Sequence, residues 1–98
     1  YPVLDTLAAL TGTMNLNLYI EGYTDNTPIK TARFSSNWEL SVERAVSVAY
    51  YLLERGVEPG TIGVSGYGPL KPIASNGTVQ GRQKNRRVEI VIMGFKKT

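Results

Sequence analysis

The segment between residues 34 and 56 constrains the fold most, because it predicts one long amphipathic helix. Ser36 is followed three residues later by Glu39, a spacing typical of a capping box at a helix start. Gly56 is expected to end the helix, since glycine favours the position just past the last turn. The side chains expected to form its core stripe are Trp38, Val42, Ala45, Ala49 and Leu52. Arg44 lies off this stripe, on the same side as Asn37.

The remaining elements follow from periodicity and from turn residues. Helical spacing is expected over 2–10 and 78–85, and alternating strand patterns over 15–25, 61–67 and 87–93, with a basic tail at 94–98. The first two strands flank the long helix, which predicts a parallel crossover between them. The fold class is therefore α/β, an α+β sandwich in which a small mixed sheet carries helices on one face.

Composition limits the possible function. The 98 residues form a single domain over 1–98, and 11 basic against 8 acidic residues give a mildly basic net charge of +3. The chain has no cysteine and no histidine, which excludes disulfide scaffolds, thiolate metal sites and a histidine general base. No apolar run approaches the roughly 20 residues that span a bilayer. The abrupt start at Tyr1 and Pro2 suggests a fragment of a longer protein.

Asp25 and Arg44 form the most informative pair of polar residues. Asp25 follows the end of the first expected strand, where loops tend to collect function. If both side chains faced one pocket, the carboxylate would accept an ammonium group and the guanidinium fork would bind a carboxylate. Such a pair would suit a zwitterion. Spacing alone favours the simpler alternative, a turn aspartate and a solvated helix arginine.

Two other groups of charges suggest different classes of protein. Arg82, Lys84, Arg86 and Arg87 could form a nucleic-acid patch, although no aromatic stacking pattern accompanies them. Arg86 and Arg87 precede a strand whose pleat sends them to opposite faces, so one could line a site while the other is solvated. A hydrolase could use two carboxylates from Asp25, Glu39 and Glu43. However, Glu39 is better explained by the helix cap and Glu43 by a solvent-facing position.

Five motifs, taken together, resemble the OmpA-like peptidoglycan-binding domain. They are Glu21-Gly22-Tyr23-Thr24-Asp25, then Asn37 through Leu40-Ser41 to Arg44-Ala45, then Gly66-Tyr67-Gly68 with Pro72, then Asn76 with Gly81-Arg82, and finally Asn85-Arg86-Arg87-Val88-Glu89. They occur in the order found in that family and span most of the chain. Within the family, residues 37–41 and the long loop over 26–36 are most similar to MotB and related flagellar stator subunits.

The resemblance implies a non-catalytic domain, without cofactor or metal, that grips peptidoglycan at the diaminopimelate of the peptide stem. Asp25 and Arg44 match the residues that hold the zwitterionic end of diaminopimelate, and Thr24, Asn37, Asn85 and Arg86 match positions beside them. Tyr23 stands where many relatives have histidine. In the family a strand usually precedes the first helix, and from the resemblance we expect that strand to be missing from this chain.

A stator-type domain would anchor an ion-conducting motor to the cell wall. The resemblance then implies a homodimer in the periplasm, joined in the full-length, inner-membrane-anchored protein to a membrane-embedded channel partner. An OmpA- or Pal-type envelope anchor unrelated to motility is the main alternative. A small basic nucleic-acid-binding domain is a more distant one.

Overall fold

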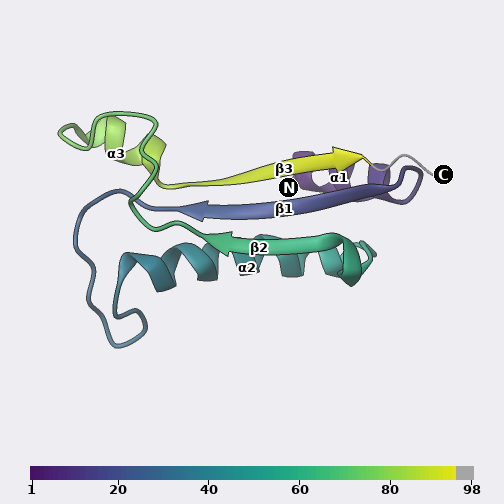
Figure 1. Ribbon diagram of the computed structural model, residues 1–98, viewed down its shortest axis with the longest axis horizontal. Coiled ribbons are helices and arrows are strands. Elements are labelled where there is room, and N and C mark those ends of the chain that lie inside the picture. The colour runs from purple at the N-terminus through teal and green to yellow at the C-terminus, as the bar shows by residue number, and fades with distance from the viewer. Residues whose placement is uncertain (95–98) are drawn as a thin grey trace.

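The computed structural model describes residues 1–94, so all of the predicted basic tail except Gly94 lies outside the described residues. Its elements in chain order are the helix α1 (Pro2–Thr11), the strand β1 (Leu16–Tyr23), the helix α2 (Asn37–Glu54), a 3-10 turn η1 (Pro59–Thr61), the strand β2 (Ile62–Gly66), the helix α3 (Val79–Asn85) and the strand β3 (Arg87–Gly94). Figure 1 shows them along the molecule. Every helix and strand expected from the sequence is present.

The three strands form a mixed sheet in the order β2-β1-β3. β1 pairs with β2 in parallel, with Leu18 opposite Ile62, and this confirms the predicted crossover through α2. β1 pairs with β3 in antiparallel register over its whole length, from Leu16 opposite Gly94 to Tyr23 opposite Arg87. The central strand therefore ends between the end of β2 and the beginning of β3.

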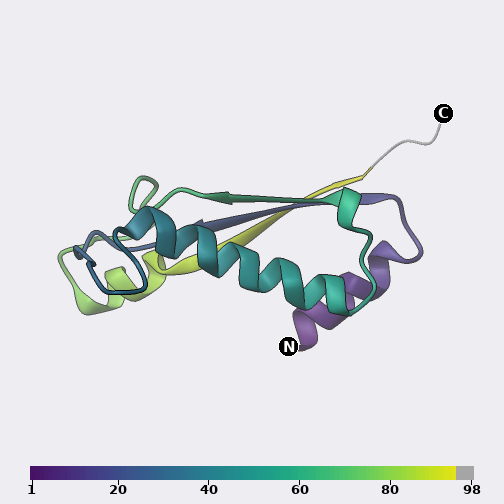
Figure 2. The same ribbon diagram turned by 90° about the horizontal axis from the view of Figure 1, so that it is seen from below.

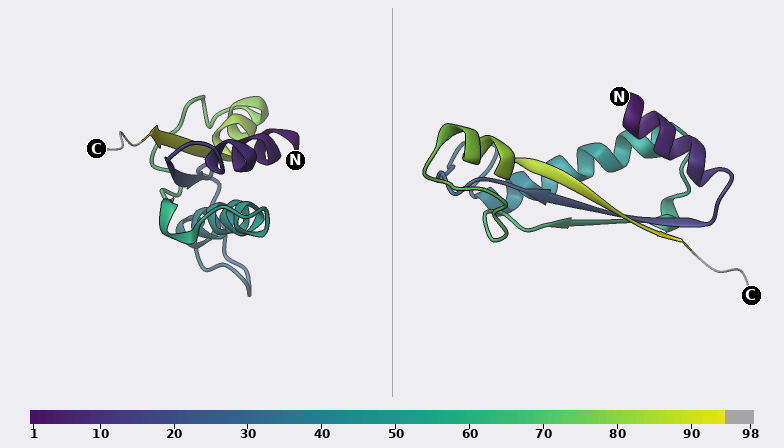
Figure 3. Two further views of the ribbon diagram at one scale, coloured as in Figure 1. Left: turned by 90° about the vertical axis from the view of Figure 1, so that its right-hand side faces the viewer. Right: turned by 90° about the horizontal axis from the view of Figure 1, so that it is seen from above.

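Helices α1 and α2 lie on the same face of the sheet, as Figure 2 shows with the sheet seen edge-on. Seen end-on in Figure 3, α1 lies toward β3 and α2 toward β2. The apolar core lies between the helices and the sheet and consists of Leu7, Ala8, Leu18, Ile20, Ala45, Ala49, Leu52 and Val57. Strand alternation places Leu18 and Ile20 inward and Tyr19 and Glu21 on the helix-free face. The expected α+β architecture is confirmed.

Two details of α2 differ from the sequence-based expectation. Ser36 is the N-cap residue but makes no side-chain capping bond, and Glu39 instead accepts hydrogen bonds from the backbone N–H and the hydroxyl of Ser35. Trp38 and Val42, expected in the core, are 45% and 43% exposed. β2 is an edge strand of the sheet that residues 1–94 form, so these two side chains, in the first two turns of α2, are covered on one side only.

None of the helices in residues 1–94 combines the length and the apolar character that crossing a membrane requires. The longest of them, α2, exposes polar residues such as Glu39 and Ser47 as well as Trp38, Val42 and Tyr50. Its amphipathic pattern matches its place on one face of the sheet.

Candidate functional site

The buried polar side chains of the described residues gather at one end of the molecule. They are Thr24, Asp25, Ser41 and Asn85. This end, which we call the site end, is where β1 and β2 finish and where α2 and β3 begin; it also carries α3 (Figure 1). Buried polar groups require hydrogen-bond partners, so this end is held by specific contacts as well as by apolar packing.

Glycines let α2 approach the sheet closely at the site end. A Cβ on Gly22 would lie 1.9 Å from the carbonyl oxygen of Ser41, and one on Gly66 would lie 2.5 Å from Val42. Gly68 has a φ of +57° and packs on the ring of Trp38. The buried Ser41 hydroxyl donates to the Trp38 carbonyl at 2.7 Å and accepts from the Gly68 N–H at 3.0 Å. These contacts fix the height and rotation of the helix that carries Arg44.

Asp25 is buried and bonded on both of its carboxylate oxygens. The residue is only 6% exposed, its Oδ1 accepts from the Thr27 N–H at 3.0 Å, and its Oδ2 pairs with Arg86 Nη1 at 2.6 Å. Burial by itself raises the pKa of Asp25, but the Thr27 hydrogen bond and the Arg86 charge outweigh it and hold the pKa below its usual range. Asp25 is therefore a fixed anion and not a solvated turn residue.

The loop around Asp25 is fastened to both neighbouring elements. The Asn37 side chain donates to the carbonyl of Thr27 at 3.0 Å and to that of Asp25 at 3.4 Å. The Thr24 N–H donates to the Gly68 carbonyl at 2.9 Å, and the Thr24 hydroxyl donates to the Asp25 carbonyl at 2.8 Å. The structure thus brings Thr24, Asn37 and Arg86 together around Asp25, four of the six predicted site residues in one cluster.

Arg44 lies on the same side of α2 as Asn37, two turns further along. Seven residues at about 1.5 Å each separate the two Cα atoms by roughly 10 Å, and helix side chains lean toward the N-terminus. Arg44 is half-buried, and within residues 1–94 it takes part in no hydrogen bond or ion pair. Within the described residues its guanidinium is therefore not engaged by another side chain, whereas Asp25 is already paired with Arg86.

Asn85 is placed differently from the other predicted site residues. Its side chain is fully buried at 0% exposure and ties the loop after β2 to the end of α3. Its Oδ1 accepts from the backbone N–H groups of Ile73 and Ala74 at 2.8 and 3.0 Å. Its amide donates to the Ala74 carbonyl at 3.0 Å and to Asn76 Oδ1 at 2.8 Å. These four bonds use the amide group completely, and the next residue in the chain is Arg86.

The structure also shows a structural role for two Gly-Tyr pairs, to which the sequence analysis assigned no role. Gly22-Tyr23 ends β1, and Gly66-Tyr67 stands at the end of β2. In each pair the glycine faces α2 and the tyrosine faces the opposite side of the sheet, where the two rings stack with centroids 5.3 Å apart. The signal was the same dipeptide at the ends of two parallel strands, and only the strand register brings the two copies together.

No metal centre is present among the described residues, since they contain no group of three or more histidine, cysteine, aspartate or glutamate side chains placed to hold an ion. The site end offers one buried carboxylate that is paired with Arg86 and accepts from the Thr27 N–H, and the helix α2 that begins at this end carries Arg44, which has no side-chain partner among residues 1–94. Such an arrangement suits the binding of a small polar group that carries both charges.

Comparison with known proteins shows which proteins this chain is similar to. Motility protein B of Bacillus subtilis (strain 168) is 50% identical over 78 residues, which are 79% of this chain and 30% of that protein. The peptidoglycan-binding protein ArfA of Mycobacterium tuberculosis (strain H37Rv) is 45% identical over 93 residues, which are 94% of this chain and 27% of ArfA. The chain thus spans less than a third of the length of either relative.

A solved structure supports the same assignment. The crystal structure of the C-terminal domain of Helicobacter pylori MotB superposes with a TM-score of 0.86 at 33% identity, covering 96% of this chain and 73% of that one. The predicted resemblance to MotB C-terminal periplasmic domains is thereby confirmed. The sequence profile of the OmpA family matches residues 1–86. This chain belongs to the OmpA family.

Proposed function

We propose that the domain binds cell-wall peptidoglycan, and that the group it recognises is the diaminopimelate of the peptide stem. The observation that carries this proposal is the buried Asp25 carboxylate, paired with Arg86 on the same end of the fold as Arg44. The similarity to a peptidoglycan-binding protein and to MotB supports it. The domain would act by binding and not by catalysis.

The side-chain end of diaminopimelate carries an ammonium and a carboxylate on one carbon. In our proposal the Arg44 fork binds that carboxylate with two parallel hydrogen bonds. Asp25 accepts the ammonium. A carboxylate offers about four acceptor positions, so Asp25 can bind an ammonium while it keeps its bonds to Thr27 and Arg86. Thr24 and Asn37 hold the Asp25 loop, and Asn85 supports Arg86 from within the fold.

We further propose that the parent protein is a flagellar stator subunit that this domain anchors to the wall. The MotB similarity in sequence and structure supports that role. The domain would then lie in the periplasm as part of a homodimer. The full-length protein, held in the inner membrane, would assemble with a membrane-embedded ion-channel subunit.

An envelope anchor unrelated to motility is the second candidate. The similarity to ArfA covers 94% of this chain, against 79% for Motility protein B of Bacillus subtilis, and supports this candidate. The sequence upstream of Tyr1 in the parent gene separates the two. A single membrane helix that carries an aspartate would indicate a stator, whereas a lipobox or a β-barrel pattern would indicate the other anchor.

Co-sedimentation with purified diaminopimelate-type cell walls tests the site. Arg44→Ala and Asp25→Ala are each expected to abolish sedimentation while the circular dichroism spectrum stays that of the folded domain. Arg55→Ala is the matched control, because it removes the same charge from the opposite end of the molecule. If both site variants sediment like the parent domain, the site assignment is wrong.

A further inference from the structure

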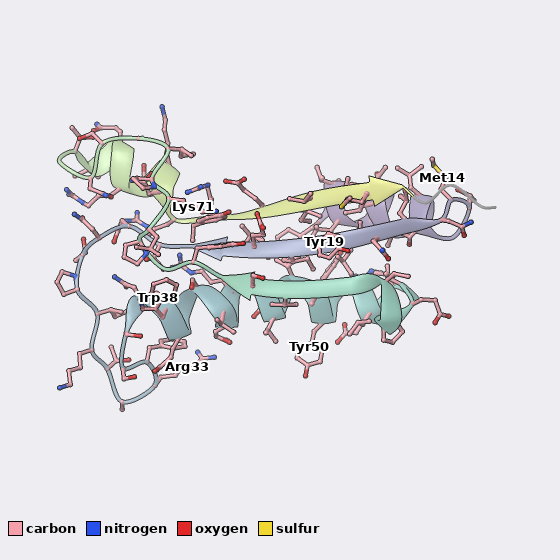
Figure 4. All side chains as sticks on the ribbon, in the orientation of Figure 1. Met14, Tyr19, Arg33, Trp38, Tyr50 and Lys71 are labelled. Carbon is pink, nitrogen blue, oxygen red and sulfur yellow. The ribbon has the colours of Figure 1, made fainter. Side chains whose placement is uncertain are left out.

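The helix-free face of the sheet carries a stack of four side chains directly behind the site. Arg87 lies over the ring of Tyr23 at 3.8 Å, Tyr23 stacks on Tyr67 with an interplanar angle of 13°, and the Lys71 ammonium lies 4.3 Å from the Tyr67 centroid. Both tyrosine hydroxyls donate to the carboxylate of Glu21. Figure 4 labels Lys71 at this end of the molecule, next to α3 and above β1.

Arg87 is the member of this stack that joins the most segments. Its Nη2 donates to the Lys71 carbonyl at 3.0 Å, its Nη1 donates to the Asn85 carbonyl at 3.4 Å, and its Nε pairs with Glu89. The side chain is only 15% exposed. A single guanidinium thus connects the end of β1, the loop after β2, the end of α3 and β3 itself.

Tyr23 and Arg87, which lie behind the site, are close in sequence to Asp25 and Arg86, which form the ion pair within it. Tyr23 is two residues before Asp25, and Arg87 directly follows Arg86. Tyr23 and Arg87 also form the last register pair of the β1–β3 ladder. Arg86 is the C-cap residue of α3 and Arg87 is the first residue of β3, so clamping Arg87 fixes the backbone from which Arg86 reaches Asp25.

We propose that Arg87 is a positioning residue: by clamping the outer face of the β1–β3 end, it holds Arg86 against Asp25. Arg87 does not touch the ligand in this account. It acts through the backbone that it shares with Arg86 and through the ring that precedes Asp25. The nucleic-acid alternative included Arg87 in a basic patch, but the Arg87 guanidinium bonds to two carbonyl oxygens and a carboxylate of its own chain.

The far end of the molecule contains a similar pair that serves as a comparison. Arg55 lies over the Tyr51 ring at 4.1 Å and contacts Asp5. Both Arg55 and Asp5 are nearly half exposed. The Arg55 side chain bonds to Asp5 of α1 and to Tyr51 of α2. The same residue types therefore form an exposed contact there, whereas Arg87 connects four segments behind a buried ion pair.

This inference deepens the proposed function, because it concerns the same site, but its test needs no ligand. The pKa of the Asp25 carboxyl, followed by carbon-detected NMR titration of the labelled domain, reports whether Arg86 stays in place. Arg86→Gln is expected to raise that pKa. Arg87→Gln is expected to raise it in the same direction, and the double variant to add no further rise, since both changes remove one interaction.

Two control variants make the result decisive. Arg55→Gln should leave the Asp25 pKa unchanged, which separates positioning from a general loss of positive charge. Arg87→Lys keeps a cation over Tyr23 but loses the fork, so it should raise the Asp25 pKa partway. It also replaces Arg87→Gln if that variant does not fold. An Asp25 pKa that stays at the parent value in the Arg87 variants while Arg86→Gln raises it would overturn the proposal, and so would an unchanged pKa in Arg86→Gln.

Wall co-sedimentation of the same variants separates this inference from the proposed function. If the Arg87 variants shift the Asp25 pKa but the parent domain does not sediment with walls, Arg87 is a positioning residue and the proposed ligand is wrong. If the parent sediments and the Arg87 variants bind as it does with an unshifted pKa, the ligand proposal stands and the positioning role is refuted.

Discussion

The two ends of the molecule are held together by different physical means. At the far end, α1 and α2 pack on the sheet through apolar side chains such as Leu7, Leu52 and Val57. At the site end, glycines bring the helix backbone onto the sheet, and buried polar side chains bond to loops. Apolar packing tolerates small shifts, whereas a buried carboxylate and its partners do not. The comparison indicates that the site end is built for fixed geometry and the far end for stability.

The largest effect on stability is expected from adding a methyl group at Gly22, where the backbone of α2 lies directly on the sheet. In Gly22→Ala the new methyl group would lie 1.9 Å from the Ser41 carbonyl, and both atoms belong to packed backbone segments. We expect a loss of more than about 3 kcal/mol in the free energy of unfolding, measured by urea denaturation. Gly60→Ala is the control, because a Cβ there meets no atom within 4 Å. Equal stability of the two variants would contradict the close-approach argument.

Removing one buried side chain from each end sharpens the comparison. Asn85→Ala leaves the N–H groups of Ile73 and Ala74 without their acceptor, which costs about 2–4 kcal/mol. Leu52→Ala opens a cavity in the apolar core and costs about 2–5 kcal/mol. Of the folded fraction, only Asn85→Ala should bind cell walls less well, because Arg86 follows it. Equal wall binding by the two variants would show that the ends are not functionally distinct.

Acid should weaken the site end through Asp25. Its pKa in the folded domain lies below the ordinary value of 3.8, so the ionised form stabilises the fold above about pH 4. That stability is lost as the pH falls through the folded-state pKa. In urea denaturation between pH 6 and pH 2, Asp25→Asn should show a smaller fall of the midpoint than the parent. The pKa values of Asp5 and Glu39 are also lowered, so these carboxylates contribute in the same direction.

The smallest effect is expected at the exposed rim of the site end. Arg33 pairs with Glu43 at 2.7 Å, but the Arg33 side chain is largely in solvent, and Figure 4 shows it on the loop beside α2. Exposed ion pairs contribute roughly 0–1 kcal/mol, so Arg33→Ala should change the urea midpoint little and wall binding not at all. A loss comparable to that of Asn85→Ala would mean that the rim, and not the buried cluster, governs the site end.

Sequence periodicity predicted the elements and their order because strand alternation and helical spacing are local properties. It placed Asp25 at a strand end and Arg44 off the apolar stripe of the helix. It failed for Trp38 and Val42, whose exposure depends on β2 being an edge strand. It also predicted a capping box between Ser36 and Glu39, whereas Glu39 accepts its hydrogen bonds from Ser35. The two adjacent serines are equally plausible partners in the sequence. The pairing of Asp25 with Arg86 joins residues 61 positions apart and needed the β1–β3 register.

Binding of two peptides that differ by one carboxylate tests the central claim most directly. Lysine is diaminopimelate without the side-chain-end carboxylate, so stem peptides with either residue differ only in the group assigned to Arg44. Titration of the labelled domain by NMR should show at least about tenfold tighter binding of the diaminopimelate peptide, with the largest shifts at Asp25, Arg44 and Arg86. Equal affinity for the two peptides, or shifts confined to the far end, would contradict the account.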